Sequence, residues 1–185
     1  MTPTTLADGL GPVTVRRYWR DVQGARRPPE AVVTWVVDHF QEVMPRPLAF
    51  VWKTAGAAGQ ARVGDCFFLI LLVRRAWVRL AVLEPHRFRN ATLRHHPESG
   101  WVEFRAVPHR SGSYRLEIES QARSSTWMDR LAYLLGNSAV QRATWEIVLN
   151  RAVAFSGGAA TIRGHHTTEH AFLPSETDAT RRAAP

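Results

Sequence analysis

The chain has 185 residues, of which 45% are hydrophobic, a formal net charge of +8 and one cysteine. This length suits one domain with a sizeable core, and a single cysteine excludes an intramolecular disulfide framework. No apolar run is long enough to cross a bilayer, and the N-terminus lacks the pattern of a secretion signal. We therefore expect a cytoplasmic protein without a transmembrane segment.

The positive charge would ordinarily suggest nucleic acid or an anionic membrane surface as a partner. Of the 24 basic residues, however, only Lys53 is a lysine, and the arginines alternate with acidic residues or are scattered along the chain. This pattern favours a solvated, mildly cationic surface over one basic block. We expect no dedicated nucleic-acid site, and a polyanion-binding module is the third interpretation of function.

The first predicted elements are a loose leader, a strand and a helix. Residues 1–12 contain glycine and proline with little periodicity, and the fold is expected to begin with a strand at 13–22. Residues 30–43 predict a helix, because their apolar residues recur at intervals of three and four, and Pro45 and Pro47 end it. Further strands are predicted at residues 48–53, 66–73, 77–83 and 87–94.

The segment 91–124 determines which side of the predicted sheet faces the core. On its last strand one set of side chains is mainly apolar: Tyr114, Leu116, Ile118, Ser120 and Ala122. The alternate set is polar: Arg115, Glu117, Glu119, Gln121 and Arg123. On the preceding strand Val102, Phe104 and Ala106 alternate with Trp101, Glu103 and Arg105. A period of two is typical of antiparallel strands, so we expect the apolar sets to face the core and the polar sets to face water.

After Ser124 the pattern changes to that of a helix. Thr126 followed by Asp129 resembles a capping box, and a break is expected at residues 136–138. The apolar stripes of this helical region are Trp127, Leu131, Leu134 and Leu135, then Trp145, Val148, Leu149, Ala152 and Val153.

The order of elements predicts an α+β fold. We expect a curved antiparallel sheet of about six to seven strands wrapped around a long C-terminal helix. Residues 13–155 would form this domain. Residues 156–185 have few large apolar side chains and are expected to be a mostly disordered tail.

Residues 13–155 also resemble a tryptophan-rich family of conserved hypothetical proteins, catalogued as domain of unknown function nineteen-ninety. The matching segments are residues 18–22, Pro29–Glu30 before a helix that ends at Pro45, then 63–65, 91–100 and 117–124. In the fourth segment the family tends to show a Gly-His-Pro-Glu-small-Gly turn, and His95 stands here in place of the first glycine. The family is similar in layout to helix-grip proteins of the START and Bet v 1 type. The resemblance therefore implies a fold that binds apolar ligands between the sheet and the C-terminal helix, but no established activity.

His96 and Glu98 are the candidate catalytic residues. An imidazole beside a carboxylate can perform acid/base chemistry at the mouth of a cavity, as in a cyclase or lyase of the polyketide type. The alternative is a hairpin turn in which Pro97 fixes the bend and Gly100 takes a positive φ. No nucleophile or set of metal ligands accompanies the pair, so we prefer the turn.

His166, Glu169 and His170 match the His-x-x-Glu-His spacing of an inverted zinc-protease motif. That chemistry requires a helix that places both histidines on one face, and a third ligand from elsewhere. Because the motif lies in the polar tail, we predict no metal site, and we expect no cofactor.

The candidate ligand-binding residues are mostly large and apolar: Trp35, Trp77, Arg79, Tyr114, Leu116, Ile118, Ser120, Trp127 and Trp145. Ligand pockets commonly combine aromatic walls with a few polar groups, although the same residues can simply pack a core. Ser120 leaves room on the apolar face, and Arg79 interrupts an apolar strand. We predict that the domain binds a small hydrophobic or amphipathic ligand in a cavity above about 300 Å³. A cyclase or lyase that uses His96 and Glu98 is the second interpretation of the function.

Overall fold

The computed structural model describes residues 1–46, 48–56, 59–71, 74–109, 112–132 and 138–172. Its strands are β1 (Leu10–Gln23), β2 (Ala49–Ala55), β3 (Cys66–Leu71), β4 (Arg74–Glu84), β5 (Arg87–Thr92), β6 (Glu98–Pro108), β7 (Tyr114–Ser124) and β8 (Ala159–His170). Its helices are the 3₁₀ helix η1 (Leu6–Asp8), α1 (Pro29–Asp38), α2 (Phe40–Val43), α3 (Trp127–Ala132) and α4 (Ser138–Ser156). Within the described residues, none of the helices combines the length and the apolar composition that a membrane span requires.

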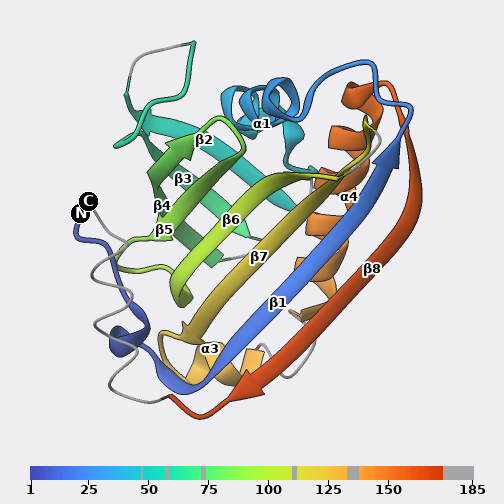
Figure 1. Cartoon of the computed structure of the whole chain (residues 1–185). Coiled ribbons are helices and arrows are strands. Elements are labelled where there is room, and N and C mark those ends of the chain that lie inside the picture. The colour runs from blue at the N-terminus through green and yellow to red at the C-terminus, as the bar shows by residue number, and fades with distance from the viewer. Residues whose placement is uncertain (47, 57–58, 72–73, 110–111, 133–137, 173–185) are drawn as a thin grey trace.

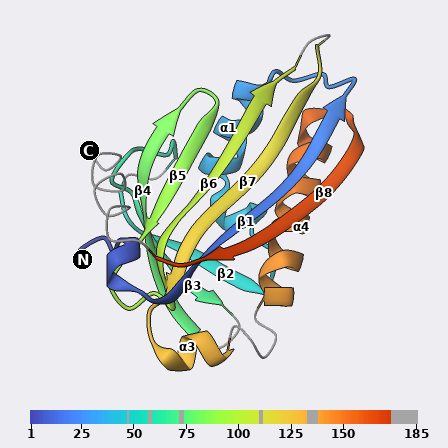
Figure 2. The same ribbon diagram turned by 60° about the horizontal axis from the view of Figure 1, so that its bottom comes forward.

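The eight strands form one sheet in the order β2-β3-β4-β5-β6-β7-β1-β8, and all neighbours are antiparallel. The sheet bends, and α4 lies along its inner side beside β1 and β7 (Figures 1 and 2). This arrangement confirms the predicted α+β fold, a curved antiparallel sheet wrapped around a long helix near the C-terminus.

The predicted alternation along β6 and β7 is correct on the inner face. Tyr114, Leu116, Ile118, Ser120 and Ala122 are all buried. Across from them, α4 buries most of its predicted apolar stripe, namely Val148, Leu149, Ala152 and Val153, and Trp145 is partly buried. Leu134, Leu135, Gly136 and Asn137 lie outside the described residues.

The predicted helix at 30–43 is divided into α1 and α2. His39 separates them with φ −102° and ψ 26°, and its Nδ1 lies 3.0 Å from the Trp35 carbonyl oxygen. The apolar positions of both helices are nevertheless buried as expected: Val33, Val36, Val37, Phe40 and Val43. Pro47 lies outside the described residues.

The strand β8 was not predicted. It pairs with β1 from Val13 to Gln23, and most of its side chains are exposed. The segment therefore joins the sheet through its backbone and buries little apolar area, so hydrophobic patterning does not reveal it. The expectation of a mostly disordered tail is wrong for residues 159–170, and residues 173–185 lie outside the described part of the chain.

The first residues also belong to the fold. Leu6 is buried, and the Thr4 amide donates a hydrogen bond of 2.8 Å to the Thr92 carbonyl at the end of β5. Arg123 donates a hydrogen bond of 2.9 Å to the Leu6 carbonyl. The expectation of a loose leader at 1–12 is wrong because these contacts join segments far apart in the sequence.

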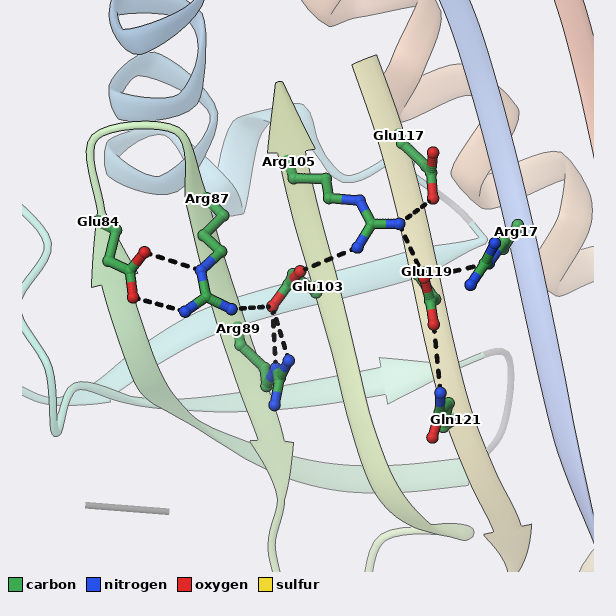
Figure 3. Close-up of polar contacts among 9 residues, drawn as sticks. All are labelled: Arg17, Glu84, Arg87, Arg89, Glu103, Arg105, Glu117, Glu119 and Gln121. Carbon is green, nitrogen blue, oxygen red and sulfur yellow. Dashed lines mark hydrogen bonds and ion pairs between the residues drawn. The ribbon is translucent and has the colours of Figure 1, made fainter. Parts of the chain in front are cut away.

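The outer face of β5–β7 is a network of ion pairs, although it was predicted to face water (Figure 3). Glu103 is only 2% exposed and Glu119 only 4%. Arg87, Arg89 and Arg105 all donate to Glu103, and Arg105 and Arg17 both contact Glu119. The arginine side chains of neighbouring strands thus cover the carboxylates. Each arginine drawn in this network is paired with at least one glutamate: Arg17 with Glu119, Arg87 with Glu84, Arg89 with Glu103 and Arg105 with Glu117.

Candidate functional site

A cavity of about 150 Å³ lies between the sheet and α4. Its walls include Val78, Val102, Ser120 and Ala122 from the sheet and Trp145 from α4. The volume is about half of the 300 Å³ expected for an ordinary ligand pocket, so the prediction of a cavity above that size is wrong. Ser120 and Ala122 leave this room because their side chains are small, as their place on the apolar face suggested.

Gly100 allows β6 to approach β7 closely beside the cavity. It pairs with Ala122 and has φ +152°, and a Cβ atom there would lie 2.0 Å from the carbonyl oxygen of Gln121. The predicted positive φ of Gly100 is confirmed, but Gly100 lies within strand β6 and not in the hairpin turn. The residue with positive φ in the turn is His95, at φ 76°, where the tryptophan-rich family tends to have glycine.

The turn at His96 and Glu98 opens onto the cavity, and both residues line it. The Nδ1 atom of His96 lies 3.0 Å from the backbone nitrogen of Glu98 and 2.9 Å from its carbonyl oxygen. Nδ1 is therefore engaged in hydrogen bonding with the backbone, and Nε2 is the ring nitrogen available for acid/base chemistry. Burial lowers the pKa of His96, so the imidazole is neutral near pH 7.

The Glu98 carboxylate is held by other partners. It accepts hydrogen bonds from Arg16 at 2.8 Å and from Gln141 at 3.2 Å. Burial raises the pKa of Glu98, but the charge of Arg16 and these hydrogen bonds, together with the charge of His96 when that imidazole is protonated at low pH, outweigh it, and the net pKa is lowered. Glu98 is therefore an ionised group at neutral pH and a poor general acid.

Three buried polar atoms at this cavity have no hydrogen-bond partner in the described part of the chain. They are Asn90 Oδ1, Ser120 Oγ and Trp145 Nε1, and all three side chains line the cavity. Buried polar atoms in folded proteins are nearly always paired. Water or a bound molecule must therefore supply their partners.

The structure brings four predicted site residues to the cavity wall: His96, Glu98, Ser120 and Trp145. Leu116 and Ile118 are buried in the adjoining core and do not line it. Tyr114 is also in the core, where its hydroxyl donates to the Arg27 carbonyl at 3.3 Å. Trp35 packs between helices, with its ring stacked 4.3 Å from that of Phe155.

The other predicted ligand-binding residues lie away from the cavity. Trp77 and Arg79 alternate with the buried Ala76 and Val78, so they point to the outer face, where Trp77 packs against Phe68. Both faces of β4 carry apolar residues, and the sequence pattern could not tell which one is inside. Trp127 is 69% exposed.

Asn90 and Arg16 are among the polar residues of this region that were not predicted as site residues. Asn90 alternates with Phe88 and Thr92 on β5, and Arg16 with Thr14 and Tyr18 on β1. Each is a polar side chain on the inner face of a strand, and this alternation was the available signal.

The His-x-x-Glu-His motif lies in β8 and not on a helix. Four residues along a strand separate His166 from His170 by roughly 13 Å, too far for one metal ion. Glu169 is paired with Arg130, at 2.8 and 2.9 Å. Within the described ranges no group of three His, Cys, Asp or Glu residues could hold a metal.

No protein-family model matches the chain, and no curated protein matches it. The resemblance to the tryptophan-rich family therefore stays a prediction.

Several solved structures share the fold. Norcoclaurine synthase from Thalictrum flavum has a TM-score of 0.59 at 8% identity, over 82% of this chain and 89% of that chain. A hypothetical protein from Helicobacter pylori has a TM-score of 0.56 at 12% identity, over 76% of this chain and 86% of that one. The di-domain ARO/CYC StfQ of the steffimycin biosynthetic pathway has a TM-score of 0.56 at 16% identity, over 82% of this chain and 52% of its own. At these identities the similarity concerns the fold alone, which is the helix-grip fold.

Proposed function

We propose that this protein binds a small apolar or amphipathic molecule in the cavity between the sheet and α4. The cavity is the observation that carries the proposal, because its wall combines apolar side chains such as Val78 and Val102 with a few polar ones. A cavity of about 150 Å³ in the core of another protein holds benzene. We therefore propose a ligand about the size of one six-membered ring.

The fold supports this proposal without identifying the ligand. A norcoclaurine synthase structure with the same fold, at a TM-score of 0.56, is in complex with dopamine and hydroxybenzaldehyde. StfQ, which also shares the fold, belongs to a biosynthetic pathway. Helix-grip domains can thus hold small molecules, and the cavity beside α4 is the place where this chain would do so.

Native mass spectrometry of freshly purified protein, combined with toluene titration followed by NMR, tests the proposal. We expect a small molecule to co-purify, or toluene to shift resonances of residues at the cavity. Ala122→Leu fills the cavity and should abolish both signals, whereas Ala154→Leu at an exposed position of α4 should retain them. A bare mass together with no response to toluene would contradict the proposal.

A cyclase or lyase is the second candidate, because both His96 and Glu98 line the cavity. The geometry leaves His96 Nε2 as the atom that would move a proton, since Arg16 and Gln141 hold the Glu98 carboxylate. A molecule that co-purifies with the His96→Gln variant should then be converted when it is incubated with the wild-type protein, and it should stay unchanged with the variant. Recovery of the unchanged molecule would leave binding as the function.

A further inference from the structure

The three unpartnered atoms of the cavity have complementary hydrogen-bonding roles. Asn90 Oδ1 can only accept, Trp145 Nε1 can only donate, and Ser120 Oγ can do either. Asn90 is 2% exposed and Ser120 is 4% exposed, so bulk water does not reach them freely. A bound group that satisfies this set must both donate and accept hydrogen bonds.

The strand register places two of these atoms on either side of the same residue. Asn90 pairs with Val102 across β5 and β6, and Val102 pairs with Ser120 across β6 and β7. The side chains of one such row point to the same face of the sheet, and here that face is the inner one. A molecule that lies over Val102 is therefore next to both polar side chains, with Trp145 contributed by α4 to the same cavity.

The charges around the cavity favour a neutral ligand. The two carboxylates that line it are already paired, Glu98 with Arg16 and Asp129 with Arg74. A cation would find both carboxylates already paired. An anion would find the lining residue Arg74 already paired with Asp129, and would face both carboxylates and the Asn90 carbonyl oxygen in a poorly hydrated space.

We propose that the cavity selects an uncharged, ring-sized molecule that carries a hydroxyl group. A hydroxyl is the smallest neutral group that both donates and accepts, and a ring of benzene size suits a cavity of about 150 Å³. This inference rests on the proposed function and specifies the chemistry of its ligand. Phenol is the simplest molecule of this class.

Calorimetric titration of the full chain with phenol, toluene and benzoate tests the inference. An apolar cavity without polar partners prefers toluene, because the hydroxyl of phenol loses its hydrogen bonds to water there. Here we expect the reverse order, with phenol binding at least about tenfold more tightly than toluene, because a site built for a hydroxyl rejects the analogue that lacks it. We expect no measurable binding of benzoate, because its charge would be buried without a partner.

Two variants test whether Ser120 and Trp145 cause the preference for phenol over toluene. Ser120→Ala and Trp145→Phe each remove one hydrogen-bonding group and should lower the ratio of phenol to toluene affinity by at least about threefold. Ser99→Ala is the matched control, since Ser99 is a buried serine of β6 whose hydroxyl lies 3.0 Å from that of Ser125 and which does not line the cavity. This variant should keep the wild-type ratio.

The possible outcomes separate the two proposals. Toluene binding as tightly as phenol, or benzoate binding more tightly, would overturn the hydroxyl inference and leave the ligand cavity standing. Wild-type selectivity in both variants would also overturn it. If none of the three compounds binds, the cavity holds water alone and the proposed function fails as well.

Discussion

The guanidinium of Arg16 donates a hydrogen bond of 2.8 Å to the carboxylate of Glu98, which joins β1 to the start of β6 at the wall of the cavity. The Arg16 side chain is only 3% exposed. Hydrogen bonds between charged groups in such surroundings are stronger than those between neutral groups. The pair therefore fixes the turn at His96 against β1 and positions the two cavity residues His96 and Glu98.

Glu98→Gln should lower the free energy of unfolding at pH 7 by about 1–3 kcal/mol, because it removes the anion that faces a buried arginine. The pKa of Glu98 is lowered in the folded protein from an ordinary value of 4.5. The stabilisation is therefore present above that value and is lost as the pH falls through the folded pKa.

Urea unfolding of both proteins at pH 7 and at progressively lower pH measures this difference. The control is Glu146→Gln, which removes an exposed pair with Arg142 on α4 and should cost less than about 0.5 kcal/mol. A difference between wild type and Glu98→Gln that does not change with pH would show that the carboxylate charge is not responsible.

Glu103→Gln should destabilise the protein by about 2–4 kcal/mol, because Arg87, Arg89 and Arg105 all lose part of their counter-charge at a buried position. Glu84→Gln is the matched change in the same network, but the Glu84 side chain is 50% exposed, and we expect a much smaller loss than for Glu103→Gln. Chemical denaturation measures both. Equal small losses would mean that water, and not the arginines, compensates the charge of Glu103.

Gly100→Ala should lower the free energy of unfolding by about 2–4 kcal/mol. The new Cβ atom would meet the Gln121 backbone at 2.0 Å, so β6 and β7 would have to separate. Gly24 has a φ of +64° and open space around it, so Gly24→Ala should cost only about 1 kcal/mol. Thermal unfolding compares the two, and similar melting temperatures would argue against a close approach at Gly100.

Removal of residues 159–185 should expose the edge of β1, which pairs with β8 along most of its length. Amide hydrogens of β1 that point toward β8 should exchange about a hundred times faster in the shortened chain. Amides between β4 and β5 should keep their protection and serve as the internal control. Unchanged exchange throughout β1 would show that β8 is not docked in solution, as the sequence pattern had suggested.

The sequence by itself determined the parts of this protein whose signal is local. The alternation from Tyr114 to Ala122 identified the inner face of β7, and the spacing of Val148, Leu149 and Ala152 identified the buried side of α4. The small residues Ser120 and Ala122 also indicated where the core would be hollow. A residue's nearest neighbours in the chain suffice for such patterns, because backbone geometry sets a period of two in a strand and 3.6 in a helix.

Only the tertiary structure decided which segments and side chains meet. β8 joins β1 through backbone hydrogen bonds, and the pattern of apolar side chains in the sequence does not reveal such bonds. Glu103 is buried because arginines from a neighbouring strand extend over it, although its place in the alternation predicted exposure. Asn90 lies in β5, Ser120 in β7 and Trp145 in α4. The strand register and the packing of α4 against the sheet bring all three to one cavity. Register and packing depend on contacts between distant residues, and the period of a single strand carries no information about them.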